Sequence, residues 1–365
     1  MPDWTQSMQR TYEYYIVDPG TWRDIQKLDT VKSCTINRDS TVDTLGSATF
    51  DIVDSLGECY IRVYLITIQN GLKEKHPLGT YLVQTPSSVF NGKTRSVTMD
   101  AYTPLLELKE KMPPIGYFLM EGDNIMKSAY LTTRENARAP VVETSCSDKL
   151  GQDFLSNTND SWLTFNRDLL LNAKYNYYLD EMGRILFAPQ QDVATMQPVW
   201  TYDDNNSSIL YPDLTVDHDI YGIPNVIEIV YSNGFRDVDN DRTDYFYTIS
   251  NDDPNSITST VSRGRKIIHR VVDPSMVGIS GTDVLITKRV VHEYAVQLLK
   301  DLSSLEYTVS YSHGYCPVRV GDCVRLNYES AGLVDVRAKV ISQSISCTPA
   351  CKVTEKAVFT TKLWR

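Results

Sequence analysis

Long apolar runs, a secretion signal and an excess of positive charge are all missing from this 365-residue sequence. A transmembrane helix needs about 18 or more apolar residues in a row, and no such stretch exists. The N-terminus lacks a basic segment followed by an apolar run, so no secretory signal is visible. We therefore expect a protein that is made in a cytoplasm and does not insert stably into a membrane.

Lysine and arginine number 36 against 46 aspartate and glutamate residues, which gives a formal net charge of −10. Non-specific binding to nucleic acid, or binding to an anionic membrane, requires a basic face that neutralises phosphates. The charge balance argues against both of these functions. It carries no information about the fold.

Recognisable catalytic and nucleotide-binding motifs are also missing. There is no Gly-x-Ser-x-Gly turn and no phosphate-binding glycine motif of the P-loop or dinucleotide type. Glu293 follows His292, but Val296 occupies the place of the second histidine of a His-Glu-x-x-His motif. The five histidines have no triad spacing: His76, His218, His269, His292 and His313. We predict no catalytic or cofactor-binding residue, although a carboxylate pair for glycoside hydrolysis stays open because separation in space defines it.

Cysteines are few and odd in number, at positions 34, 59, 146, 316, 323, 347 and 351. Two cysteine pairs, Cys316-x6-Cys323 and Cys347-x3-Cys351, are candidate zinc ligands, and His313 lies near the first pair in the sequence. Structural zinc prefers about two to four residues between paired cysteines, because both sulfurs must meet the ion from one tight turn. The six-residue gap between Cys316 and Cys323, across Pro317 and a Gly-Asp turn, instead places these two cysteines on adjacent strands. We therefore predict buried thiols without disulfides and no metal site.

An acidic stretch at residues 237–244, DVDNDRTD, resembles the start of a calcium-binding loop. Its continuation does not fit, because Arg242 stands where such a loop needs glycine and Thr248 where it needs glutamate. A solvated acidic loop is the favoured interpretation. An acidic patch that faces a partner stays open.

Tyrosine is abundant, with 23 residues against 9 phenylalanines and 5 tryptophans. Tyrosine suits protein interfaces, since its ring provides apolar area and its hydroxyl can form hydrogen bonds. It also favours β-strands. The composition leaves both explanations open.

Residues 1–102 have the pattern of a first β-barrel-like module. Ala48, Phe50 and Ile52 alternate with polar neighbours, as in a half-buried strand. Residues 59–71 form a β-branched and aromatic run that ends in Asn-Gly, and a second Asn-Gly follows at 91–92. Five or six antiparallel strands are expected.

We predict that residues 103–215 form an α+β middle domain, because the spacing of apolar residues changes there from that of strands to that of helices. We predict helices within 103–112, 122–140 and 161–176. Asp123 or Asn124 would cap the second helix and Ser161 the third. A hairpin over 177–189 should turn near Met182 and Gly183.

Residues 216–365 are predicted to form a second β-barrel-like module with a helical insertion at about 251–304. Its long helix, over 282–305 with Thr282 or Asp283 as cap, has one apolar stripe: Val284, Val291, Ala295, Leu298 and Leu302. Segments 216–250 and 305–365 should combine and resemble residues 10–102. The expected fold class is mainly β with an α+β insertion, built on two barrel-like modules.

The order of features in the last 140 residues or so resembles the baseplate-hub, or tail-associated, family of long-tailed phages. A strand at 226–234, the polar segment 251–256 and the long helix precede a Gly-Asp turn within 318–324. The strand VISQSIS at 340–346 then leads to a tight turn and a closing strand. GSATFDIVDS at 46–55 and GTYLVQTPSS at 79–88 are similar to the first barrel of that family.

This resemblance implies a non-enzymatic virion protein of the phage tail tip, a homotrimeric ring that continues the tail tube and connects it to the host-binding apparatus. The two barrels would alternate around the lumen, and DNA would pass without specific binding. Implied partners are the tail tube or distal tail protein, the tape measure and the tip or spike protein. Because residue 365 follows the closing strand, a hydrolase or host-binding part is expected elsewhere. The alternative is a tail-associated cell-wall-degrading enzyme or a glycan-binding module.

Overall fold

The computed structural model describes the chain except for residues 1, 54–55, 91–94, 192, 194, 206–208, 219, 233–243, 273–283, 303–304 and 362–365. The chain folds into two compact units. Unit 1 comprises Met1–Thr215 and Ser310–Ala357, and unit 2 comprises Val216–Val309 and Val358–Arg365. No described helix is long and apolar enough to span a bilayer.

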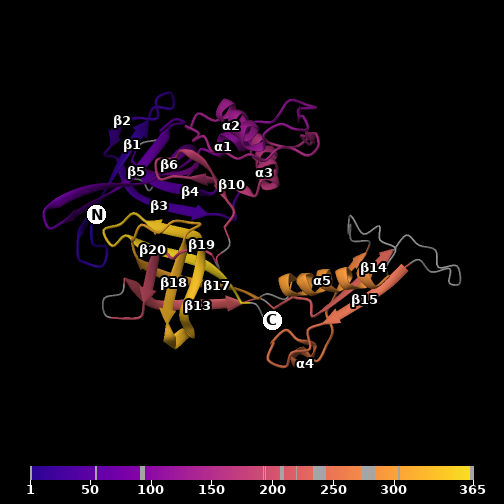
Figure 1. The fold of residues 1–365 in the computed structure, drawn as a ribbon. Helices are drawn as coiled ribbons and strands as arrows, with labels where there is room; N and C mark the ends of the chain where they lie inside the picture. The colour runs from indigo at the N-terminus through magenta and orange to yellow at the C-terminus, as the bar shows by residue number, and fades with distance from the viewer. Residues whose placement is uncertain are drawn as a thin grey trace. The chain divides into compact units, whose positions relative to one another are not determined.

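Thirteen strands form one large sheet (Figure 1). Its first part contains β1 (Gln9–Val17), β2 (Asp24–Leu28), β3 (Val31–Asp39), β4 (Gly46–Ile52), β5 (Tyr60–Gln69), β6 (Leu72–Phe90) and β7 (Arg95–Tyr102). Its second part contains β12 (Trp200–Asp203), β13 (Leu210–His218), β17 (Leu305–Gly314), β18 (Cys323–Tyr328), β19 (Leu333–Ser346) and β20 (Lys352–Thr361). The strand order is β13-β17-β20-β19-β3-β4-β7-β6-β5-β1-β2, with β18 pairing β19 and β12 off this path.

The two parts of the sheet meet where β3 pairs with β19, from Asp39 opposite Ser342 to Thr35 opposite Ser346. Figure 1 shows these strands side by side. The mainly β fold is confirmed, and the described strands of the two expected barrel-like modules form one open sheet that does not close into barrels. Strand β3 pairs with β4 along one edge and with β19 along the other. Strands β2 and β13 therefore remain at the ends of the described sheet.

Alternation of side chains along the strands is confirmed where the sequence predicted it. In β4, Ala48, Phe50 and Ile52 are buried and their neighbours are half-buried. The first eight residues of β5 are all buried, which identifies it as a central strand covered on both faces.

The middle segment contains three helices, as predicted, and the hairpin. The elements are α1 (Leu106–Glu110), β8 (Phe118–Leu119), α2 (Ile125–Asn136), β9 (Phe154–Leu155), α3 (Trp162–Asn172), β10 (Tyr175–Leu179) and β11 (Ile185–Pro189). Asn124 caps α2 by accepting from the Lys127 N–H at 2.8 Å, and Ser161 caps α3 by accepting from that of Thr164 at 3.1 Å. The hairpin turns at Gly183, whose φ of +75° lies in the left-handed region.

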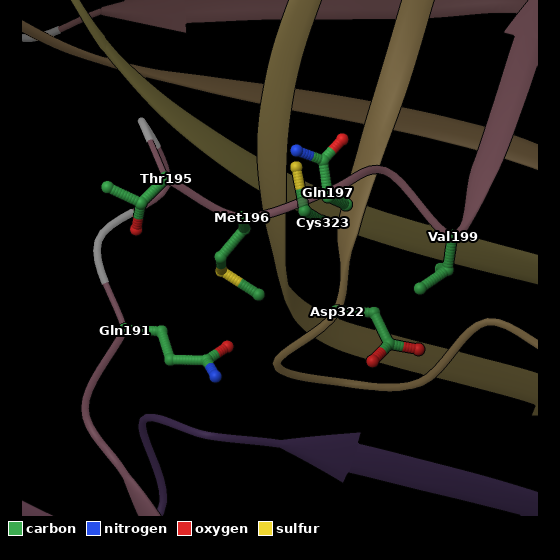
Figure 2. A pocket seen from close by; sticks show the side chains of 7 residues that line it. All are labelled: Gln191, Thr195, Met196, Gln197, Val199, Asp322 and Cys323. Carbon is green, nitrogen blue, oxygen red and sulfur yellow. The ribbon is translucent and has the colours of Figure 1, made fainter.

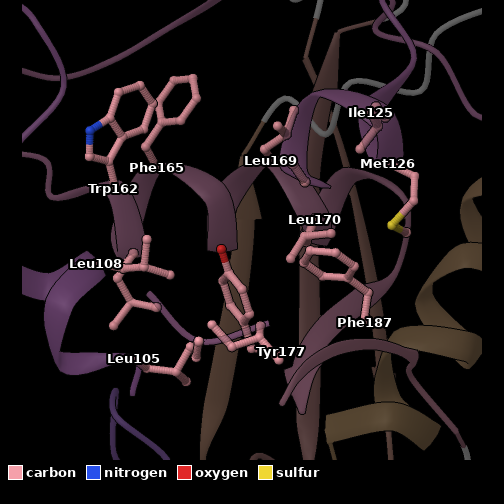
Figure 3. Packing of buried hydrophobic residues seen from close by; sticks show 14 of the residues in the cluster. Leu105, Leu108, Ile125, Met126, Trp162, Phe165, Leu169, Leu170, Tyr177 and Phe187 are labelled. Carbon is pink, nitrogen blue, oxygen red and sulfur yellow. The ribbon is translucent and has the colours of Figure 1, made fainter. Parts of the chain in front are cut away.

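A single apolar cluster holds this segment together (Figure 3). It joins the inward faces of α1, α2 and α3 to β10 and β11. Its members include Leu105, Leu108, Ile125, Met126, Leu169, Leu170, Tyr177 and Phe187. Val17, Tyr60 and Leu82 from the first part of the sheet also belong to it, as does Trp22 between β1 and β2. The middle segment is thus packed directly on that sheet.

Unit 2 contains its own three-stranded sheet. Its elements are β14 (Val226–Ser232), β15 (Asp244–Ser250), α4 (Thr260–Arg263), β16 (Ile268–Val272) and α5 (Val284–Leu302). Strand β14 lies in the centre, antiparallel to β15 and parallel to β16. On α5, Val291, Ala295 and Leu299 pack against Ile227 and Ile229, with Leu298 and Leu302 partly buried beside them.

This sheet corrects the expected composition of the second module. Strands β14 and β15, within 226–250, do not join the strands of 305–365, because they form a separate sheet with β16. Among the described strands that reach into 216–250, only β13, which ends at His218, pairs with β17 in the large sheet. The division into 1–102, 103–215 and 216–365 otherwise stays a prediction. The caps Thr282 and Asp283, the Asn-Gly at 91–92 and residues 237–243 of the acidic stretch lie outside the described residues.

We predict that Leu169→Ala lowers the free energy of unfolding by about 2–5 kcal/mol, because it opens a cavity in the middle cluster. Leu171→Ala on the same helix is the matched control. Leu169 is 0% exposed and Leu171 is 46% exposed, so the control should cost about 1 kcal/mol or less. Chemical denaturation of both variants measures the difference. Equal losses would contradict the packing described for α3.

Candidate functional site at the sheet junction

A network of buried and half-buried polar side chains lies where the two parts of the large sheet meet. We call it the junction network. Its members come from five strands: Arg38 on β3, Tyr202 on β12, Tyr311 and His313 on β17, Gln343 on β19 and Glu355 on β20, with Cys316 after β17. On β17 and β20 they follow the two-residue period of a strand, so they share the inward face with Val309, Val353 and Ala357.

Glu355 is the centre of the network and is 0% exposed. The Tyr311 hydroxyl donates to its Oε2 at 2.7 Å, and His313 Nε2 lies 3.2 Å from its Oε1. Gln343 Nε2 donates to Oε1 as well, and the Tyr202 hydroxyl lies 3.4 Å from Oε2. A buried carboxylate is very costly without partners, and this one has donors at both oxygens.

His313 is 0% exposed and has an acceptor at each ring nitrogen. Its Nδ1 lies 2.6 Å from the Gly314 carbonyl oxygen, and its Nε2 faces the Glu355 carboxylate. The Tyr202 hydroxyl also lies 3.1 Å from Nε2. Since the carbonyl and the carboxylate only accept and the hydroxyl can accept, this geometry accommodates a ring with protons on both nitrogens. Burial by itself lowers the pKa of His313, but its bonds to Cys316 and Glu355 and the charge of Glu355 outweigh this and raise the pKa to about 10.

The pKa of Glu355 shifts in the complementary direction. Burial raises it, but the hydrogen bond and charge of His313, together with the bonds from Tyr311 and Gln343, leave it below its ordinary value. The network therefore contains a buried ion pair at neutral pH. Removing one member of such a pair leaves an uncompensated charge.

Arg38 extends the network into the first part of the sheet. Its Nη1 donates to Gln343 Oε1 at 3.2 Å, and its Nη2 donates to the Leu78 carbonyl oxygen on β6 at 2.6 Å. Gln343 Nε2 also donates to the Val318 carbonyl oxygen at 2.9 Å. Gln343 therefore links the ion pair to Arg38 across the β3–β19 pairing.

A second buried cation holds the middle segment on the first part of the sheet. Arg62 on β5 pairs with Asp24 on β2 at 2.7 Å and donates to the Met182 carbonyl oxygen at 3.2 Å. Trp22 Nε1 donates to the same carbonyl at 2.8 Å. A Cβ at Gly183 would lie 2.6 Å from Thr80 Cβ, so glycine permits this close approach.

The junction network contains residue types used in nucleophilic catalysis, but its geometry does not support that chemistry. Cys316, His313 and Glu355 are all buried, and Cys316 Sγ lies 3.9 Å from His313 Nδ1. That nitrogen already faces the Gly314 carbonyl oxygen, so it is not positioned to take a proton from the thiol. The arrangement stabilises the junction.

A cavity of about 330 Å³ lies beside β18 (Figure 2). Its described lining is Gln191, Thr195, Met196, Gln197, Val199, Asp322 and Cys323. Asp322 is the one carboxylate in that lining, and burial raises its pKa. Glycoside hydrolysis uses two carboxyl groups that flank the bond, so these residues do not supply such a pair.

The cysteines considered for zinc are distributed over three places. Cys316 belongs to the junction network, Cys323 begins β18, and Cys347 and Cys351 lie in the segment between β19 and β20. In the described part of the chain, no group of three or more histidine, cysteine or acidic residues could hold a metal ion. All seven cysteines are free thiols.

Sequence reasoning did not find the junction network, because its members are far apart in the chain and form no motif. One signal was present. Glu355 occupies an inward position of β20 between Val353 and Ala357, where an apolar residue is expected. A charge at an inward strand position indicates a buried partner.

We predict that Glu355→Gln lowers the free energy of unfolding by about 3–5 kcal/mol, because it leaves His313 in a buried site without its counter-charge. Asp335→Asn is the matched control, since Asp335 is exposed and pairs with Arg325 at 3.1 Å. The control should lose about 1 kcal/mol or less. Equal losses in denaturant titrations would show that the buried pair has no special role.

The same pair predicts a dependence of stability on pH. The folded pKa of His313 lies near 10, above its ordinary 6.5, so its contribution is complete below about pH 6.5 and is lost as pH rises towards 10. The lowered pKa of Glu355 adds a contribution that is present above about pH 4.5 and lost in acid. The difference in melting temperature between the wild type and Glu355→Gln should therefore shrink from pH 7 to pH 10. A constant difference would contradict the protonated state of His313.

No family model matches the sequence, and no curated protein sequence does. Solved structures do match. The tail protein from Neisseria meningitidis has a TM-score of 0.62 and 11% identity, covering 97% of this chain and 98% of that one. The 43-kDa tail protein of prophage MuSo2 from Shewanella oneidensis has a TM-score of 0.62 and 10% identity, covering 95% of this chain and 98% of the other. The resemblance found in the sequence is thus confirmed at the level of the fold, and this chain has the fold of these tail proteins.

Proposed function

We propose that this chain is a structural, non-enzymatic protein of a phage tail. It acts as the baseplate hub at the tail tip, where three copies form a ring that continues the lumen of the tail tube. The ring connects the tube to the tip or host-binding apparatus. The observation that carries the proposal is the fold, which two tail proteins share over nearly the whole length of both chains.

The buried chemistry supports a structural role. The ion pair of His313 and Glu355 and the cation of Arg62 join segments of unit 1 that are distant in sequence. Their carboxylate and carbonyl partners lie within the protein. The side chains that resemble catalytic groups have no exposed surface on which to receive a substrate. These features favour a rigid subunit over a cell-wall-degrading enzyme.

The ends of the large sheet suit assembly with other subunits. Strands β2 and β13 each have one edge unpaired within the described sheet, and such edges can accept a further strand. A head-to-tail interface between different edges closes into a ring when the rotation between copies permits it. The net charge of −10 suits the wall of a conduit through which DNA passes without binding.

We predict that the purified chain has three times the mass of a single chain in size-exclusion chromatography with light scattering. Negative-stain images should show a ring with threefold symmetry. Three copies bring roughly −30 of charge together, so added salt should strengthen the assembly or leave it intact. A single-chain mass at all concentrations, or a single copy on the axis of the tail tip, would contradict the ring.

The same preparation distinguishes the structural role from the enzymatic alternative. A peptidoglycan zymogram should show no lysis, with a known lysozyme on the same gel as the positive control. Lysis that disappears after substitution of one carboxylate or histidine would overturn the non-enzymatic proposal. The mass measurement and the zymogram therefore test different parts of it.

A further inference from the structure

Two cysteines face each other across the strand pairing that joins the two parts of the large sheet. Cys34 lies in β3, and Cys347 directly follows β19. The register that places Ser346 opposite Thr35 places Cys347 opposite Cys34, and the Cys347 N–H donates to the Cys34 carbonyl oxygen at 2.9 Å. Directly opposed residues of this kind have Cα atoms about 5.5 Å apart, within the range that disulfides span.

Both thiols are buried. Cys34 is 3% exposed and Cys347 is 7% exposed. Burial, followed by the hydrogen bond and the charge of Cys347, raises the pKa of Cys34 well above its ordinary value. Cys34 is therefore protonated at neutral pH, and the strand register places its side chain and that of Cys347 on the same face of the sheet.

The third cysteine nearby has another partner. Cys351 is buried in the turn before β20, where its φ of +45° is unusual for a residue with a side chain. Burial raises its pKa to about 11, although a hydrogen bond with Tyr12 opposes this shift. Tyr12 also donates to the Thr348 carbonyl oxygen at 3.0 Å, which holds the turn against β1.

We propose that Cys34 and Cys347 are an oxidation site that forms a disulfide in the folded protein and covalently joins the two parts of the large sheet. The biological setting rests on the proposed function. A tail subunit would assemble as the dithiol in a reducing cytoplasm, and the released particle would meet oxidising surroundings. The cross-link would then strengthen the junction after assembly is complete.

The oxidant is a small-molecule disulfide such as glutathione disulfide. Cys347, the more exposed thiol, loses its proton, and its thiolate attacks one glutathione sulfur and releases the first glutathione. The Cys34 thiolate then attacks the Cys347 sulfur of the mixed disulfide and displaces the second glutathione. Two protein thiols are oxidised and one glutathione disulfide is reduced to two thiols. Because the raised pKa of Cys34 makes its thiolate scarce, the reaction should be slow at pH 7 and faster at pH 8.5.

The test uses the full folded chain, incubated with glutathione disulfide at pH 8.5, then denatured and alkylated. Five of the seven thiols should react with the alkylating agent, and peptide mapping should join the Cys34 and Cys347 peptides. The melting temperature should rise by about 5–10 °C and fall again after reduction. Cys34→Ala and Cys347→Ala should each abolish the rise, whereas Cys323→Ala, a buried cysteine of β18, should keep it.

Three results would overturn the proposal: seven alkylated thiols after prolonged oxidation, glutathione adducts alone, or a bond between Cys347 and Cys351. Peptide mapping of the wild type decides among them even if a variant does not fold. The mapping does not depend on oligomeric state. A chain that forms the bond but no ring would refute only the proposed function, and a ring without the bond would refute only this inference.

Discussion

The pairing of β3 with β19 is the constraint on which the rest of unit 1 depends. It is short, from Thr35–Asp39 to Ser342–Ser346, yet it turns two groups of strands into one sheet. It also occupies the edges that would otherwise be available to close each group into a barrel. The junction network lies beside this pairing, so the most costly buried charges of the unit depend on its register.

The buried network makes that register specific. Gln343 and Ile345 are both inward on β19, and a slip of one residue would turn both outward. The slip would also separate Gln343 from the half-buried Arg38 and the buried Glu355, leaving both charges with fewer partners. An apolar junction of the same size would tolerate a slip in strand register more easily. The polar junction therefore favours one arrangement of the two sheet parts.

Features that arise from neighbours along the chain could be predicted from the sequence. Alternation in β4, the caps Asn124 and Ser161, the turn at Gly183 and the apolar stripe of α5 all reflect local periodicity or local hydrogen bonds. The resemblance to phage tail hub proteins also depended on the order of such local features. Each element forms largely from its own residues, so the order of elements expected from the sequence is also the order found in the structure.

Only the tertiary structure decided which strand edges meet. Periodicity shows which side of a strand is buried but not which strand lies beside it, so it did not reveal that β3 pairs with β19 or that β14 and β15 belong to a separate sheet. The junction network was hidden for the same reason. His313 and Glu355 are separated by β18 and β19 in the chain, and their charges become partners only after β17, β19 and β20 pair. The sequence by itself determined the elements and their inward faces, whereas the pairing of distant strands determined the site, because long-range contacts leave no local pattern.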